Sequence, residues 1–316
     1  MSSLFPPIEP FEQGTLRCAT GPHALYFELC GKRAGVPAIF LHGGPGSSIN
    51  AGHRRFFDPT FFRVALFDQR GCGRSTPRGA IEHNSTQHLI ADIEHLRETL
   101  GISRWMVFGG SWGSTLALAY AQAHPQRVCA MVLRGLFLAS AAEVEWYLAG
   151  LRHFLPEAWD AFVAGVPRAQ ARAVIDWYAA QVLGDDAQAA RSAARRWGAY
   201  ESAAMAVGET NSAAGVVDEP ALLDRVRVQL HYLRNACFLE PGQLLRGMPA
   251  LARIPAILVQ GRRDLVCPPA TAYTVQRAWP SAQLRMVEDG GHSAMHPAIA
   301  AALVQATEDA KGMCGA

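Results

Sequence analysis

Residues 109–113 read GGSWG, a G-x-S-x-G pattern set between an apolar run and a stretch of good helix formers. The apolar run at residues 105–108 predicts a short buried strand, and residues 114–123 predict a helix that ends near His124-Pro125. In that context the pattern predicts a sharp strand-to-helix turn that holds the serine hydroxyl out of the sheet. Ser111 is therefore a candidate nucleophile.

A serine hydroxyl is a weak nucleophile near neutral pH, so it needs a base, and the base needs a group that orients it. Asp264 follows the apolar run at residues 254–261, and His292 follows the strand-like segment at residues 284–288. Both come just past predicted strands, where open parallel sheets place their sites. The order serine, aspartate, histidine is the one used by α/β hydrolases, and we predict the triad Ser111, Asp264 and His292.

Each later member of this triad has an alternative interpretation. Asp264 could be a turn carboxylate ahead of Pro268-Pro269, and His292 a hydrogen-bonded loop histidine. Asp289 is a rival for the acid, but it lies only three residues before the histidine, where a turn former is more typical.

A glycine-rich loop provides a further element of such a site. Residues 42–46 read HGGPG and follow the apolar segment at residues 38–41. Glycines there let a backbone N–H point at a developing oxyanion. We predict that the main-chain amides of Gly44 and Trp112 form the oxyanion hole, Trp112 being the residue after the nucleophile. His42 is expected to be an architectural hydrogen-bonding group rather than a second base.

Five short motifs together make the chain resemble a known family. They are HGGPG at 42–46, DQRGCGRS at 68–75, GGSWGS at 109–114, LRG at 133–135 and GGH at 290–292. The chain resembles the proline iminopeptidases, prolyl aminopeptidases of the S33 group in the α/β-hydrolase superfamily, over nearly its whole length. The resemblance implies an α/β-hydrolase fold, the same triad, and removal of an N-terminal proline without a metal or organic cofactor.

The order of predicted elements points to the same fold class. Strands near 37–42, 63–68, 104–109 and 128–134 alternate with helical stretches near 86–100 and 112–124, after an opening antiparallel pair. This alternation predicts an α/β fold with a mostly parallel sheet flanked by helices. From about residue 139 to about residue 243 the spacing is helical, with no convincing strand. We predict a catalytic domain of residues 1–138 and 244–316 and an inserted helical cap domain of residues 139–243.

The resemblance also implies substrate-binding residues. Residues 197–201 read WGAYE, similar to a family segment that marks Glu201 as the anchor of the substrate ammonium, and Phe137 matches an aromatic residue of the proline-ring pocket. An exposed helix carboxylate and a core aromatic under the cap are the respective alternatives. Where the family usually has a second glutamate, Gln229 stands in this chain, so an altered or weak preference for proline is expected. Alternatively, Gln229 is a solvated amide that does not contact substrate.

Composition limits the other classes of function. The 316 residues are half hydrophobic, and a net charge of +2 with interspersed signs gives no basic face for nucleic acid. No apolar run is long enough to cross a membrane, and the first 14 residues lack a signal-peptide pattern. The seven cysteines are scattered, odd in number and without metal-site spacing, so reduced thiols and a cytoplasmic location are expected. The expected partner is a small peptide or aminoacyl substrate, and the sequence does not set the oligomeric state.

Two other functions stay open. A related serine esterase or amidase that acts on small acyl or aminoacyl substrates is favoured by Gln229. A ligand-binding α/β-hydrolase protein without turnover is the other, and the intact triad and oxyanion loop argue against it. Epoxide and haloalkane hydrolysis are disfavoured because the turn carries Ser111 rather than an aspartate.

Overall fold

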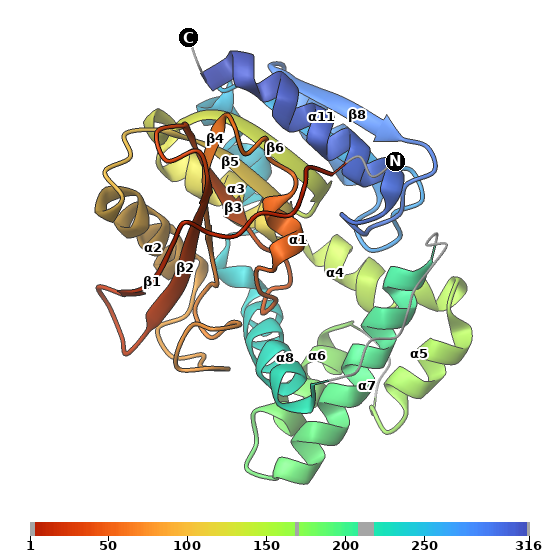
Figure 1. Ribbon diagram of the computed structural model, residues 1–316. Coiled ribbons are helices and arrows are strands. Elements are labelled where there is room, and N and C mark those ends of the chain that lie inside the picture. Colours follow the sequence, from red (N-terminus) through yellow and green to blue (C-terminus); the bar gives the residue numbers. More distant parts are fainter. Residues whose placement is uncertain (1–3, 168–170, 208–217, 315–316) are drawn as a thin grey trace.

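The computed structural model describes residues 4–167, 171–207 and 218–314, and within these residues one eight-stranded sheet organises the chain (Figure 1). Its strand order is β1-β2-β4-β3-β5-β6-β7-β8. The strands are β1 (Glu12–Arg17), β2 (Ala24–Gly31), β3 (Val36–Leu41), β4 (Phe62–Phe67), β5 (Trp105–Ser111), β6 (Val128–Leu136), β7 (Ala256–Gly261) and β8 (Ala282–Val287). Strand β2 pairs antiparallel with β1 and β4, and all later pairings are parallel. The predicted, mostly parallel sheet with an antiparallel opening pair is confirmed.

The sheet has a hydrophobic core on each face because side chains alternate along a strand. In β5, Trp105 and Val107 point into one core, and Met106 and Phe108 point into the other. The first core is closed by α2 (Thr86–Thr99), α3 (Trp112–Ala123) and α10 (Pro269–Ala278). The second is closed by α11 (Pro297–Cys314) and by the segment that follows the short helix α1 (Ala51–Arg54). Such two-sided burial explains why the central strands read as continuous apolar runs.

The turn between β5 and α3 is as sharp as the sequence predicted. Strand β5 ends at Ser111, whose φ of 57° and ψ of −127° lie outside the regular regions, and α3 begins at the next residue. A Cβ on Gly113 would lie 2.1 Å from the main-chain oxygen of Leu41, and a Cβ on Gly109 would lie 2.2 Å from that of Gly113. Only glycine permits this close approach of helix to strand. The turn therefore lifts Ser111 to the carboxyl edge of the sheet.

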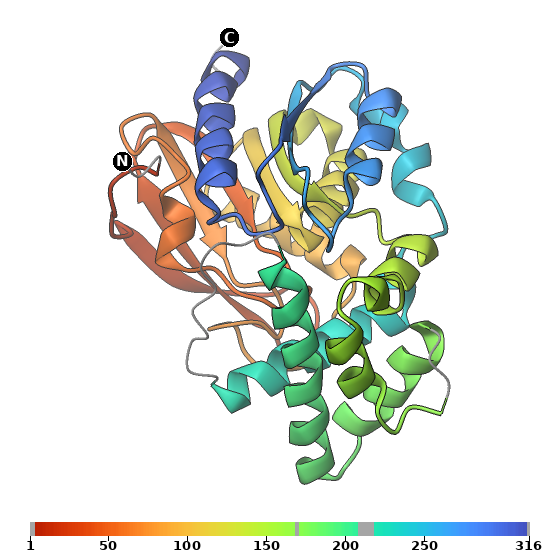
Figure 2. The same ribbon diagram turned by 90° about the vertical axis from the view of Figure 1, so that its right-hand side faces the viewer.

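Between β6 and β7 the described chain forms helices and no strand. These are α4 (Ala141–Leu148), α5 (Pro156–Val163), α6 (Ala171–Val182), α7 (Ala187–Ala206), α8 (Glu219–Arg234) and α9 (Gln243–Arg246). Helices α4 to α8 gather at one side of the sheet in both views (Figures 1 and 2). Aromatic side chains hold them together: the ring of Phe162 stacks on Tyr200 with centroids 4.2 Å apart and on Tyr178 with centroids 4.8 Å apart. The division of the chain into two domains stays a prediction.

The expectation that all cysteines are reduced is wrong for two of them. Cys129 in β6 and Cys314 at the end of α11 form a disulfide, with Cα atoms 5.2 Å apart. Their separation of 185 residues hides the pair in the sequence, because the two meet only when α11 packs on β6. The remaining cysteines, all buried thiols, are Cys18, Cys30, Cys72, Cys237 and Cys267.

Within the described ranges, no helix combines the length and the apolar character needed to cross a membrane.

Candidate active site

The carboxylate of Asp264 and the imidazole of His292 meet beyond the ends of β7 and β8. Nδ1 of His292 lies 2.8 Å from Oδ2 and 3.0 Å from Oδ1 of Asp264, and both side chains are buried. The backbone N–H of Cys267 donates to Oδ1 at 2.8 Å and holds the carboxylate in place. An acceptor beside Nδ1 keeps the proton on that nitrogen, so Nε2 carries the lone pair that a base needs.

The rival acid lies elsewhere. Asp289 pairs with Arg263 at 2.8 Å, and 76% of its side-chain surface is exposed. The imidazole of His292 already has the buried Asp264 as its partner on Nδ1. The geometry therefore favours Asp264 over Asp289 as the group that orients the histidine.

A cavity of about 420 Å³ gathers most of the predicted site residues. Ser111 and His292 line it from the sheet, and Glu201 and Gln229 line it from α7 and α8. Gly44 and Phe137 complete the predicted residues on its wall. The remaining two predicted residues are adjacent to the cavity wall. Asp264 stands behind His292, and Trp112 supplies the first main-chain amide after Ser111.

Gln69 and the imidazole of His42 connect the glycine-rich loop to the start of α3. Nε2 of His42 accepts from the backbone N–H of Gln69 at 3.0 Å, which leaves Nδ1–H to donate to the main-chain oxygen of Gly43 at 2.9 Å. Burial lowers the pKa of His42, so the ring stays neutral, as these contacts require. Gln69 donates to the His42 carbonyl and accepts from the indole of Trp112, both at 2.9 Å. The contacts agree with the architectural role predicted for His42.

Phe137 is tied to the nucleophile turn through two hydroxyl groups. Ser114 Oγ donates to the main-chain oxygen of Ser111 at 2.7 Å and accepts from the backbone N–H of Phe137 at 3.2 Å. Thr115 Oγ1 donates to the main-chain oxygen of Phe137 at 2.6 Å. The aromatic wall of the cavity and the serine therefore keep a fixed relative position.

Arg134 is a site residue that sequence reasoning left without a role. Its Nη1 donates to the main-chain oxygen of His292 at 2.6 Å and lies 3.3 Å from Nε2 of the same residue. A Cβ on Gly110 would lie 2.7 Å from Nη2, so the guanidinium packs against the strand just before Ser111. Burial lowers the pKa of Arg134, and the charge of Asp264 opposes that change. The LRG motif at residues 133–135 was the sequence feature that could have indicated Arg134 as a site residue.

Glu201 is surrounded by donors. Oε1 accepts from the hydroxyl of Tyr147 at 3.2 Å and from Nε2 of Gln229 at 2.6 Å, and Oε2 accepts from Nη2 of Arg225 at 2.9 Å. Burial, and the charge of Glu201, raise the pKa of Tyr147 well above its ordinary value, so the phenol stays a donor. Gln229 is buried and its oxygen accepts from the indole of Trp197 at 3.0 Å. The alternatives of a solvent-exposed carboxylate at 201 and a solvated amide at 229 are therefore wrong.

Tyr147 and Arg225 were missed by sequence reasoning. Arg225 precedes Gln229 by four residues on α8, so the two share one helical face, and that spacing could have indicated Arg225. Tyr147 lies on α4, far from Glu201 in sequence, and only the packing of α4 against α7 brings them together. No pattern in the sequence signals that contact.

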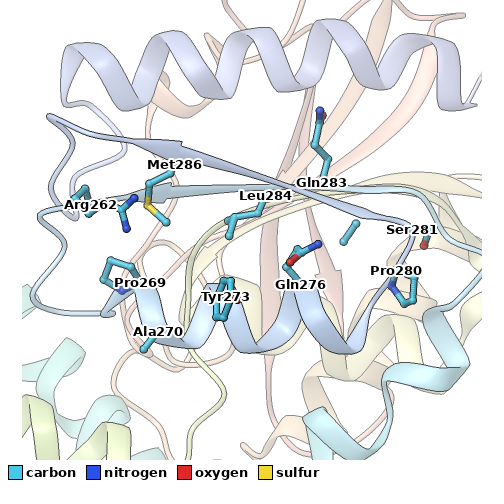
Figure 3. Close-up of a pocket in the computed structure, with 11 residues that line it drawn as sticks. Arg262, Pro269, Ala270, Tyr273, Gln276, Pro280, Ser281, Gln283, Leu284 and Met286 are labelled. Atoms are coloured by element: carbon cyan, nitrogen blue, oxygen red, sulfur yellow. The ribbon is translucent and has the colours of Figure 1, made fainter.

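A separate hollow of about 910 Å³ lies between α10 and the edge strand β8 (Figure 3). Its walls carry Tyr273, Leu284 and Met286, and the charged residue among its lining, Arg262, pairs with the exposed Glu288 at 3.0 Å. The described lining contains neither a histidine nor a carboxylate. Its serine, Ser281, donates to the main-chain oxygen of Ile254, so the hollow lacks groups suited to catalysis. Among the described residues, no three histidine, cysteine or carboxylate side chains gather where they could hold a metal ion.

Comparison with known proteins identifies relatives that match nearly the whole chain. The family model of the alpha/beta hydrolase fold matches residues 37–298. A proline iminopeptidase of Xylella fastidiosa (strain 9a5c) is 43% identical over 311 residues, which make up 98% of this chain and 99% of the relative. One from Arabidopsis thaliana is 42% identical over 99% of this chain and 83% of its own length.

Solved structures show the same fold at lower identity. A proline iminopeptidase-related protein from Thermus thermophilus aligns with a TM-score of 0.63 at 23% identity, over 96% of this chain and 98% of its own. A putative aryl esterase from Burkholderia cenocepacia aligns with a TM-score of 0.66 at 14% identity, over 96% of this chain and 100% of its own. At such identities the similarity shows the fold alone.

Proposed function

Because the chain belongs to the proline iminopeptidase family of α/β hydrolases, we propose that it is a serine aminopeptidase that releases N-terminal proline from short peptides. The expected substrate is a small peptide or aminoacyl compound, and the chemistry proposed below uses no metal or organic cofactor. The observation that carries the proposal is the placement of Glu201 in the same cavity as Ser111 and His292. A carboxylate at that place suits a substrate ammonium close to the scissile bond.

In the proposed mechanism, Ser111 Oγ attacks the prolyl carbonyl carbon while Nε2 of His292 takes the hydroxyl proton. Asp264 holds the imidazole and stabilises its positive charge. The amides of Gly44 and Trp112 stabilise the oxyanion of the tetrahedral intermediate, where one such donor is worth about 3 kcal/mol. His292 then gives the proton to the departing amine. Water, activated by the same histidine, releases proline from the acyl-enzyme.

We assign the two tasks of this mechanism to different parts of the chain. The proposed catalytic domain, residues 1–138 and 244–316, carries the triad and the oxyanion loop. The proposed cap, residues 139–243, carries Glu201 and Gln229, and Phe137 forms the pocket wall for the proline ring just before it. The cytoplasmic location also stays a proposal, and the disulfide removes one of its original grounds, the expectation of reduced thiols throughout.

The direct test compares two matched amides. Prolyl-β-naphthylamide carries the free ammonium, and its N-acetyl derivative does not. We expect kcat/KM to be at least tenfold higher for the free amine, since a hydrogen bond to a charged group contributes roughly 1.5–3 kcal/mol. A panel of other aminoacyl-naphthylamides gives the preference for proline. No hydrolysis of any prolyl amide by the folded enzyme would rule out the proposed function.

A serine esterase is the second candidate, and one observation favours it. The carboxylate of Glu201 already accepts hydrogen bonds from Arg225, Gln229 and Tyr147, so its charge is partly neutralised before any substrate arrives. Short acyl esters, assayed beside the naphthylamides, distinguish the two. Rapid ester hydrolysis with equal rates on free and acetylated prolyl amides would favour the esterase.

A further inference from the structure

The polar end of the cavity contains a cation of its own. Arg225 Nη2 lies 2.9 Å from Oε2 of Glu201, and the guanidinium reaches it from α8 while the carboxylate comes from α7. Among the described residues that line the cavity, Glu201 is the carboxylate, and the arginines are Arg225 and Arg134. A substrate ammonium therefore meets a carboxylate that already has a counter-ion.

The neighbouring Gln229 does not offer a hydrogen-bond acceptor to a substrate ammonium beside Glu201. The indole N–H of Trp197 can only donate, so the atom of Gln229 that faces it at 3.0 Å must be the amide oxygen. The NH₂ group of Gln229 is thereby turned toward Glu201, to which it donates at 2.6 Å. Gln229 thus presents a donor to the space beside Glu201, although a substrate ammonium that binds there would need an acceptor.

The guanidinium of Arg225 also borders a cavity other than the one that holds Ser111. Arg225 is more exposed than Glu201, with 38% against 18% of the side-chain surface accessible. It also lines a second cavity, of about 540 Å³, whose wall carries the carboxylates Asp218, Glu219 and Asp224. Asp224 and Glu219 already pair with Arg78 and Arg195, so a displaced guanidinium would meet a polar wall of paired charges and Asp218 rather than an apolar environment.

We propose that Arg225 is a specificity-determining residue, a resident counter-ion of Glu201 that a substrate ammonium must displace. This inference rests on the proposed function in so far as Glu201 is the amine anchor. It predicts that the enzyme binds free amines less tightly than its carboxylate would allow. A partly exposed ion pair contributes roughly 0.2–1 kcal/mol, which corresponds to a change in affinity of about 1.4- to 5-fold.

The test measures amine binding without turnover. Isothermal titration of L-prolinamide and of N-acetyl-L-prolinamide is carried out on the Ser111→Ala protein, with and without Arg225→Met. We expect Arg225→Met to tighten the binding of L-prolinamide two- to fivefold and to leave that of the acetylated compound unchanged. Arg225→Lys keeps the charge and should bind like the parent, and Arg225→Gln is a second neutral variant should the methionine protein fold poorly.

A matched control separates the local effect from a general change of charge. Arg195→Met also removes one cation, but Arg195 pairs with Glu219 at 2.8 Å and lines only the second cavity. It should leave the affinity for L-prolinamide unchanged. Equal or weaker binding by both neutral Arg225 variants overturns the proposal, as does an equal gain with Arg195→Met. Undetectable binding by every protein overturns it too, because removal of the competitor should expose the carboxylate.

The outcome for Arg225 stays distinct from that for the proposed function. Hydrolysis of prolyl-β-naphthylamide by the active enzyme decides the function. If the enzyme cleaves no prolyl substrate and yet Arg225→Met tightens prolinamide binding, the counter-ion role stands while the aminopeptidase proposal fails. Cleavage of prolyl substrates with unchanged binding in Arg225→Met gives the reverse result.

Discussion

The guanidinium of Arg134 donates to the main-chain oxygen of His292, with Nη1 2.6 Å from that oxygen and 3.3 Å from Nε2 of the ring. The first contact is a short hydrogen bond from a charged donor, and the second is longer than the usual range of about 2.7–3.2 Å and therefore weak. Arg134 therefore sets the position of the loop that carries the histidine. It also stands beside the nitrogen that must receive the serine proton.

Replacing Arg134 by lysine tests this positioning role. Lysine keeps the charge but lacks the flat fork of donors, so we expect kcat to fall tenfold or more while KM changes little. The measurement is steady-state kinetics on prolyl-β-naphthylamide. Arg104→Lys is the control, since Arg104 also donates to a main-chain oxygen, that of Val128, but outside the cavity. An equal loss of kcat in both variants would assign Arg134 a general structural role.

Ser111→Ala should abolish hydrolysis of amides and esters alike. The turn owes its shape to the close approach of Gly109 and Gly113 to neighbouring backbone, so loss of the hydroxyl should leave the melting temperature unchanged. Activity assays and thermal unfolding on the same preparation check both halves. Turnover above a trace in the folded variant would exclude Ser111 as the nucleophile.

The two candidate acids make a matched pair. Asp264→Asn should lower kcat by about 10⁴, because the amide cannot hold the imidazole in the required tautomer. Asp289→Asn should have little effect, since that carboxylate is exposed and pairs with Arg263. His292→Ala should be as damaging as Asp264→Asn, and neither loss should add to that of Ser111→Ala, because a triad acts as a unit. A large loss of kcat in Asp289→Asn, with little loss in Asp264→Asn, would assign Asp289 as the acid.

Changes of charge at the proposed amine-binding site around Glu201 should act only on substrates with an amine. Glu201→Gln should raise KM and lower kcat/KM for the free prolyl amide, and spare an acyl ester. Gln229→Glu should raise kcat/KM for the free amide, because a second carboxylate can accept from the ammonium while the Trp197 indole still donates to it. An acetylated substrate brings no ammonium for the added carboxylate to accept from, so the gain should vanish on acetylation. Equal effects on free and acetylated amides would show that Glu201 only shapes the cap.

Cys267 offers a chemical probe of the cavity. Its thiol lies on the cavity wall, and burial, with the charge of Asp264 adding, raises its pKa well above the ordinary value. A raised pKa keeps the thiol protonated, so alkylation by iodoacetamide should be slow at pH 7 and should accelerate as the pH rises. Alkylation should inhibit by filling the cavity, and Cys267→Ala should resist it. Inhibition of the Cys267→Ala enzyme at the wild-type rate would place the sensitive thiol elsewhere.

The sheet, which the structure confirms, and the proposed triad were both predicted from local order in the sequence. Ser111 is the last residue of β5, Asp264 follows β7 and His292 follows β8, and parallel strands bring such positions to one edge. The groups around Glu201 could not be foreseen in the same way. The contact of Tyr147 with Glu201 depends on how α4 packs on α7, and the Cys129–Cys314 disulfide depends on how α11 packs on β6. Packing between distant segments leaves no periodic trace in a single sequence.

The placement of the charged groups has a consequence for how such enzymes diverge. Glu201, Arg225, Gln229 and Tyr147 all belong to helices inserted between β6 and β7, whereas the proposed triad stands at the ends of strands. Mutation can therefore alter the balance of charge around Glu201 without displacing the serine, the histidine or the aspartate. One or two substitutions on α8 would change the charge beside the proposed amine anchor and leave the proposed triad in place.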